Sequence, residues 1–134
     1  MRIMLDTNVL ISVMIFPNPR MNSMMEYIFS QHELVLSTFI LDELKFVIAD
    51  KFPQKTSYVE MLLQKMSYEL VEIPEKIDPS LFNIRDESDA PVLYSAVKAG
   101  ADILVTGDKD FAEVEYTHPE IMSPAAFLVK YMGM

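Results

Sequence analysis

The sequence predicts an α/β protein, a three-layer sandwich in which a central, mostly parallel sheet carries helices on both faces. Short apolar segments alternate along the chain with longer segments of helical periodicity. The connections between the short segments are too long for hairpins, which favours parallel strands joined by helical crossovers. At 134 residues, of which 51% are hydrophobic, the chain can form one domain over residues 1–134 with a sizeable core.

The expected strands are short apolar runs that end at a polar residue, a glycine or a proline. They cover residues 2–5, 33–37, 70–73 and 103–106, with a weaker candidate at 120–122. Pro74 closes the third strand because proline has no N–H to donate to a sheet.

The expected helices fill the intervals between these strands. They cover residues 8–15, 20–30, 38–50, 55–68 and 89–100, a short turn at 111 and a terminal segment from 123. Pro17 and Pro19 separate the first two helices, and Pro53 ends the third. Helical spacing is expected to form two faces, made by Tyr58, Met61, Leu62, Lys65 and Met66 in one helix and by Leu93, Ala96 and Val97, turned to the core, in another.

Composition narrows the class of function. Cysteine is absent, so a metal must bind through oxygen or histidine, and thiol chemistry is excluded. No stretch reaches the roughly 18 to 20 unbroken apolar residues of a membrane span, and no basic and apolar leader precedes the first strand, so we expect a cytoplasmic protein that does not enter a membrane. The net charge of −9 argues against broad attraction to a polyanion. Acids gathered around bound cations would account for part of this charge.

Acidic residues follow two of the predicted strands. Asp6 comes directly after the strand 2–5, and Asp108 and Asp110 follow the strand 103–106. Because the carboxyl ends of parallel strands line one crevice, these acids are expected to converge and to offer oxygen ligands to a hard divalent cation. Each has a simpler local explanation, since Asp6 is a good helix N-cap and the segment 107–110 also fits a surface turn.

Two further acids are placed on helices. Glu43 lies at the edge of the apolar stripe of helix 38–50, whereas Asp42 points nearly opposite and is expected to be solvated. Asp89 starts the next helix but one, four residues before Leu93 and on the same side. An ordinary boundary glutamate and an N-cap are the simpler explanations for Glu43 and Asp89.

Four motifs in order resemble the PIN domain family over almost the entire chain. They are Leu5-Asp6-Thr7-Asn8-Val9-Leu10, Leu41-Asp42-Glu43-Leu44, Asp89-Ala90 with Gly100-Ala101-Asp102, and Val105-Thr106-Gly107-Asp108-Lys109-Asp110-Phe111. The resemblance is strongest to the small bacterial and archaeal PIN proteins that act as toxins of VapBC-type toxin–antitoxin pairs.

This resemblance implies an endoribonuclease that depends on Mg²⁺ or Mn²⁺. The implied catalytic and metal-binding quartet is Asp6, Glu43, Asp89 and Asp108, with Asn8, Thr106 and Asp110 as auxiliary residues. Bound cations polarise the scissile phosphate and lower the pKa of an attacking water. The implied partners are an RNA substrate, an antitoxin segment laid over the active site, and a second copy of the chain in a homodimer.

Three alternatives stay open at this stage. A haloacid-dehalogenase-like phosphatase also places an aspartate after its first strand, but it needs Asp-x-Asp where this chain has Asp6-Thr7-Asn8. A receiver-type signalling domain fits Lys109, but it needs a phosphoacceptor aspartate after a middle strand, and residues 70–74 contain none. A catalytically silent binding module is the third, with a helical stripe that more often forms core: Met21, Met24, Met25, Ile28 and Phe29.

Overall fold

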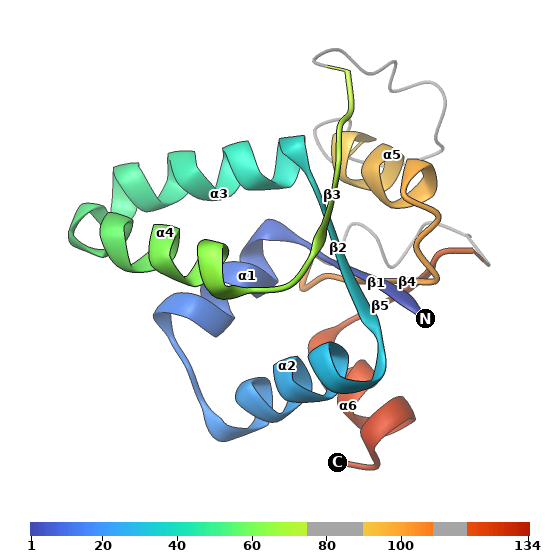
Figure 1. Ribbon diagram of the computed structural model, residues 1–134. Helices are drawn as coiled ribbons and strands as arrows, with labels where there is room; N and C mark the ends of the chain where they lie inside the picture. The colour runs from blue at the N-terminus through green and yellow to red at the C-terminus, as the bar shows by residue number, and fades with distance from the viewer. Residues whose placement is uncertain (75–89, 109–117) are drawn as a thin grey trace.

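The computed structural model describes residues 1–74, 90–108 and 118–134, and these residues contain one five-stranded parallel sheet (Figure 1). The strand order is β3-β2-β1-β4-β5, and every neighbouring pair is parallel. The strands are β1 (Arg2–Leu5), β2 (Glu33–Ser37), β3 (Glu69–Val71), β4 (Ile103–Val105) and β5 (Glu120–Met122). The expected parallel sheet is confirmed, including its weaker fifth strand.

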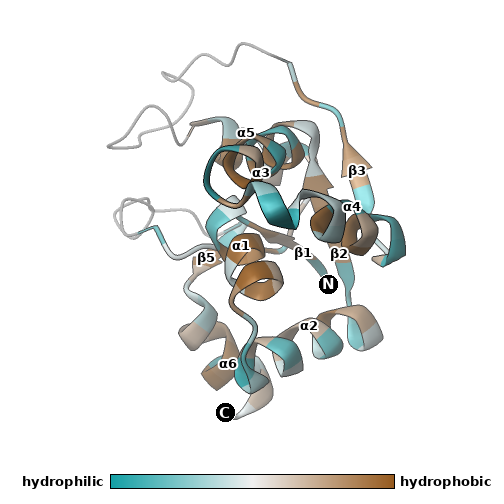
Figure 2. Cartoon of the chain, turned by 90° about the vertical axis from the view of Figure 1, so that its left-hand side faces the viewer, coloured by the Kyte–Doolittle hydropathy of each residue, from teal (hydrophilic) through white to brown (hydrophobic). Residues whose placement is uncertain are grey.

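Helices cover both faces of this sheet. They are α1 (Thr7–Ile15), α2 (Pro19–Gln31), α3 (Thr38–Lys51), α4 (Thr56–Lys65), α5 (Ala90–Lys98) and α6 (Pro124–Met132), with a 3₁₀ turn, η1 (Pro53–Lys55), before α4. Helices α1 to α4 lie on one side of the sheet and α5 lies on the other (Figures 1 and 2). The predicted three-layer α/β sandwich is therefore confirmed. No described helix is both long enough and apolar enough to cross a membrane.

Short polar residues start the helices where the sequence places them. The Asn18 side chain accepts a hydrogen bond from the Met21 backbone N–H at 3.0 Å and starts α2. Ser37 does the same for α3, where its Oγ accepts from the Ile40 N–H at 3.2 Å. Each cap satisfies a backbone donor that the first turn of a helix leaves without a partner, and so fixes where that helix begins.

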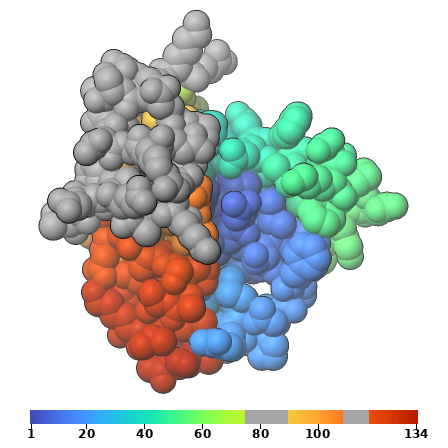
Figure 3. All heavy atoms as spheres, turned by 180° about the vertical axis from the view of Figure 1, so that it is seen from behind, coloured from blue at the N-terminus to red at the C-terminus, as the bar shows by residue number. Residues whose placement is uncertain are grey.

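The core joins the sheet to α1, α2 and α3, and it also contains buried residues of α5 and α6. The hydrophobic helix α1 sits between α3 and α2 (Figure 2). The methionine stripe of α2 belongs to this core, since Met24 and Ile28 are fully buried and only Phe29, 39% exposed, reaches the surface. The stripe is therefore mostly core, which argues against a protein-binding surface on α2. At the far end, α6 packs against α2 (Figure 3), and the buried Phe127 ring meets the Tyr27 ring edge-on.

Two expected helix faces are confirmed only in part. In α4 the structure buries Val59 and Leu63, while Tyr58 and Met61 are each 41% exposed. Apolar residues occur on two adjacent stripes of this segment, and the choice between them is made by packing rather than by periodicity. The helix also ends at Lys65 instead of residue 68, since the chain must extend into β3. In α5 the expected inward residues Leu93 and Ala96 are fully buried, whereas Val97 is 46% exposed.

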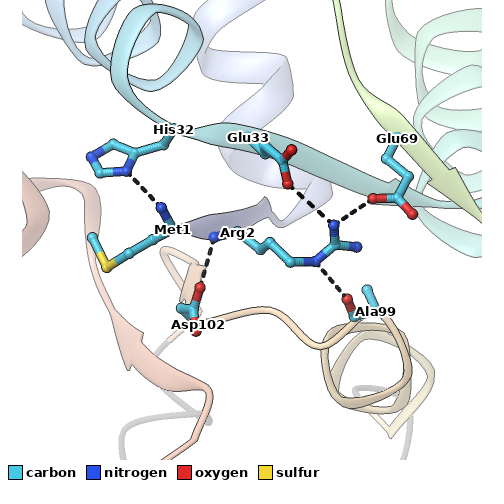
Figure 4. A network of polar contacts seen from close by, with 7 residues as sticks. All are labelled: Met1, Arg2, His32, Glu33, Glu69, Ala99 and Asp102. Atoms are coloured by element: carbon cyan, nitrogen blue, oxygen red, sulfur yellow. Dashed lines mark hydrogen bonds and ion pairs between the residues drawn. The ribbon is translucent and has the colours of Figure 1, made fainter.

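Arg2 joins four segments at the amino ends of the strands (Figure 4). Its Nη1 lies 2.6 Å from Glu69 Oε2 and 3.3 Å from Glu33 Oε2. Its Nε donates to the Ala99 carbonyl at 3.0 Å, and its backbone N–H donates to Asp102 Oδ2 at 2.7 Å. These bonds tie β1 to β2, to β3 and to the segment that leads from α5 into β4.

We predict that Arg2→Met lowers the free energy of unfolding by about 1–2 kcal/mol, because the aliphatic stem stays while the charged bonds are lost. Urea titration followed by circular dichroism measures the change. Arg20→Met is the matched control, since Arg20 is an exposed residue of α2. Equal stability of the Arg2 variant and the wild type would contradict a structural role for this network.

Candidate active site

The site lies where the chain connections diverge. From β1 the chain runs to β2 on one side, and from β4 it runs to β5 on the other, although β1 and β4 are neighbours in the sheet. Open α/β sheets place their ligand crevice at such a switch point, beyond the carboxyl ends of the strands. Asp6 directly follows β1 there, and Thr106 directly follows β4.

Asp6 is buried and held by both neighbouring elements, with 6% of its surface exposed. Its Oδ1 accepts from the Thr7 backbone N–H at 2.7 Å, so the carboxylate caps α1. Its Oδ2 accepts from the Thr106 hydroxyl, also at 2.7 Å. Asp6 is therefore a helix cap, as the local explanation states. Its second oxygen, Oδ2, is free of the cap and binds Thr106 on the other side of the crevice.

Thr106 links the two strand ends. While its hydroxyl donates to Asp6, its Oγ1 accepts from the Asp108 backbone N–H at 3.1 Å. Thr106 is 3% exposed, and its bond to Asp6 is buried, while the bond from the Asp108 N–H is partly buried. The turn after β4, which carries Asp108, is thereby fixed relative to the carboxylate that follows β1.

A cavity of about 370 Å³ lies beyond these strand ends. It is lined by Asp6, Thr7, Asn8, Glu43, Phe46, Val47, Val92 and Asp108. The structure thus brings together three of the four predicted acids, with the auxiliary Asn8. Asp89 and Asp110 lie outside the described residues. Asp42 is exposed and lines a different hollow, whereas Glu43 is half-buried, so the argument that separated the two is confirmed.

Burial raises the pKa of the Asp6 carboxyl above its usual value, because the charged form has lost most of its water. The bonds from Thr106 and from the Thr7 N–H oppose this change, and the nearby charges of Glu43 and Asp108 add to it. A bound cation would stabilise the ionised carboxylate in this position.

The donor set fits a hard divalent cation. Asp6, Glu43 and Asp108 line one cavity, and the buried Thr7 Oγ1 has no hydrogen-bond partner within the described residues. Mg²⁺ and Mn²⁺ prefer such oxygens, and Mg²⁺ keeps several of its waters. Over residues 1–74, 90–108 and 118–134, no three acidic or histidine side chains form a complete metal cluster. Mg²⁺ is usually bound by only one or two protein carboxylates, so it does not require such a cluster.

Sequence reasoning missed the apolar residues of this cavity. Val92 on α5 and Phe46 on α3 line it, and neither was expected there. For Phe46 a signal was present, because it lies three residues after Glu43 and so on the same side of the helix. Neither residue carries a chemical group that would have marked it as part of a site.

We predict that Thr106→Val weakens metal affinity or activity about 10- to 100-fold, the usual range when a group that orients a metal ligand is removed. The valine keeps the shape and β-branching but removes the donor to Asp6 and the acceptor for the Asp108 N–H. Loss of the donor also raises the pKa of Asp6 further. Thr106→Ser restores the hydroxyl and is the control. Equal Mn²⁺ affinity in the valine variant and wild type, by calorimetric titration, would remove Thr106 from this role.

A family model described as "PIN domain" matches residues 2–110, and the chain belongs to this family. Proteins of this family are generally nucleases. Among solved structures, the chain resembles one in "Crystal structure of VapBC2 from Rickettsia felis bound to a DNA fragment from their promoter", with a TM-score of 0.63 and 20% sequence identity over 92% of this chain and 98% of that chain. That likeness concerns the fold. No curated protein sequence matches the chain.

Proposed function

We propose that this protein is an endoribonuclease dependent on Mg²⁺ or Mn²⁺. One observation carries the proposal: in a PIN domain, Asp6, Glu43 and Asp108 reach one cavity at the switch point of the sheet, with Asp6 buried between its two neighbours. Asp89, directly before α5 in the sequence, completes the proposed quartet, and Asp110 is the auxiliary acid. Family membership argues against the phosphatase and receiver alternatives.

In the proposed reaction, Asp6, Glu43, Asp89 and Asp108 would hold the metal. When bound, it would supply polarisation of the scissile phosphate and a more acidic attacking water. The residues of the chain fix the positions. Thr106 and the Thr7 N–H orient the Asp6 carboxylate, the start of α3 presents Glu43, and Asn8 offers an amide at the cavity wall. Because the Asp6 carboxylate is pre-oriented, it needs little reorganisation when substrate enters.

We further propose that the protein is the toxin of a VapBC-type pair, cytoplasmic and homodimeric, with an antitoxin as its protein partner. The shared fold with a chain of the VapBC2 structure supports this. The proposal gives a reason for the acidic surface, because an antitoxin that covers the site can supply basic groups opposite the acids of the cavity. Its net charge is −9.

Cleavage of a mixed pool of structured and single-stranded RNA tests the ribonuclease proposal. Purified protein is incubated with Mn²⁺, with Mg²⁺ or with EDTA, alongside a DNA pool and p-nitrophenyl phosphate. We expect RNA cleavage with either metal and none in EDTA. Turnover of p-nitrophenyl phosphate alone would contradict the proposal and favour a phosphatase. Cleavage of the DNA pool alone would also contradict it and would indicate a deoxyribonuclease.

A further inference from the structure

Phe46 is exposed at the edge of the acidic cavity. Its side chain is 73% exposed, the highest value among the large hydrophobic residues that the structure describes. Single exposed apolar residues are common and need no explanation by themselves. Phe46 differs in its place, because it lines the same cavity as Asp6, Glu43 and Asp108. It follows Glu43 by three residues on α3, which puts their Cβ atoms about 5–6 Å apart.

The charge of the cavity limits how it can hold RNA. Proteins that bind single strands combine a basic groove along the phosphates with aromatic rings on which bases stack. No lysine or arginine is among the described residues that line this cavity. The whole chain carries a net charge of −9. The described residues of this cavity therefore offer RNA contacts to its bases rather than cations for its phosphates.

The ring is carried on a rigid support. Helix α3 has 14 residues, begins at a Ser37 cap and is anchored by the buried side chains of Ile40, Leu44 and Ile48. The residues of this anchor and Phe46 lie on different sides of the same helix, so the ring stays at the surface while the helix is held by the core. A group on a packed helix keeps its position better than one on a loop.

We propose that Phe46 stacks on an unpaired base beside the phosphate in the acidic cavity, and so selects single-stranded RNA as the substrate. This inference rests on the proposed ribonuclease function. A nucleobase fits the mixed wall, because its flat faces match Phe46 while its polar edge can meet the exposed Asn8 amide, which forms no hydrogen bond to any described residue.

The test is a double-mutant cycle that combines a substitution of Phe46 with removal of a base from the substrate. The substrate is a single-stranded RNA oligomer with one cleavage site, compared with versions that carry an abasic residue on either side of that site. The variants are Phe46→Ala, Phe46→Leu and Phe46→Trp. Phe29→Ala is the control, since it removes an exposed ring that lines a separate hollow with His32 and Glu33.

We expect Phe46→Ala and Phe46→Leu to lower kcat/KM about tenfold or more, the usual effect of losing one base–aromatic stack, while Phe46→Trp stays near wild type. For the wild type, kcat/KM should fall by a similar factor when one of the two abasic oligomers replaces the intact oligomer. For Phe46→Ala, the same replacement should change kcat/KM little, because ring and base act as one contact. Phe29→Ala should cleave like the wild type. Unchanged melting temperatures show that the variants fold.

Several results would overturn the inference while leaving the ribonuclease proposal intact. Wild-type kcat/KM in Phe46→Ala would do so, as would equal activity of Phe46→Leu and Phe46→Trp, since apolar packing alone would then suffice. Normal cleavage by Phe46→Ala together with loss of binding to a purified antitoxin would assign the ring to a protein interface. Absence of any cleavage by the wild type would instead reject the ribonuclease function, and this inference with it.

Discussion

Glu43→Gln is expected to lower the rate of RNA cleavage at least about 100-fold, while Asp42→Asn leaves it unchanged. Both substitutions replace a carboxylate by an isosteric amide, on adjacent residues of one helix. Glu43 is half-buried and lines the cavity with Asp6, whereas Asp42 is exposed and faces elsewhere. The pair therefore separates a role at the site from a general effect of removing negative charge from α3.

Initial rates on one RNA oligomer, at saturating Mn²⁺, measure both variants. Equal losses in the two would mean that total charge or the stability of α3 governs activity. Full activity in Glu43→Gln would show that the Glu43 carboxylate has no role in catalysis. Thermal melts of both proteins show whether either substitution disturbs the fold.

Asp6→Asn is expected to raise the melting temperature of the metal-free protein at neutral pH, although it removes a carboxylate with two hydrogen bonds. The pKa of Asp6 is raised in the folded state, mainly by burial. Between the unfolded and the folded pKa, the folded state therefore binds more protons than the unfolded state, and stability falls as pH rises through this window. Above the folded pKa the charged, buried carboxylate is a standing cost, which the amide removes.

The measurement is a series of thermal melts in EDTA from about pH 4 to pH 8. Each 1 kcal/mol corresponds to a shift of about 4–8 °C for a domain of up to about 100 residues and to less for a larger one. The wild type should lose stability as pH rises relative to Asp6→Asn, while the exposed-residue control Asp42→Asn should follow the wild type. Added Mn²⁺ should raise the melting temperature of the wild type and not of Asp6→Asn, because ligand binding to the folded state stabilises it. Parallel pH profiles for wild type and Asp6→Asn would contradict the assigned cost.

The sheet could be predicted because its strands depend on local signals. Residues 2–5 and 33–37 are short apolar runs that end at good helix caps, Asp6 and Ser37, and the structure has both strands with these bounds. The α4 segment could not be settled in this way. It has apolar residues on two adjacent stripes, and packing against α3 decides that Val59 and Leu63 are buried.

The candidate site could be predicted in part, again from local signals. Strand-end position predicts that Asp6 and Asp108 lie near one another, and helical geometry separates Glu43 from Asp42. The double role of the Thr106 hydroxyl depends on the register of β1 against β4, in which Leu5 pairs with Val105. That pairing joins residues a hundred positions apart, and no local pattern encodes it. Phe46 lacked a predicted role because exposure cannot be read from its own residue type.

The most direct test of the metal-dependent ribonuclease is the rate of RNA cleavage as a function of Mn²⁺ concentration, for wild type and Asp6→Asn prepared identically. The account predicts no cleavage in EDTA, a rate that rises to saturation for the wild type as Mn²⁺ is added, and a rate at least about 100-fold lower for Asp6→Asn at every concentration. Cleavage that persists in EDTA, or that is equal in the two proteins, would contradict it.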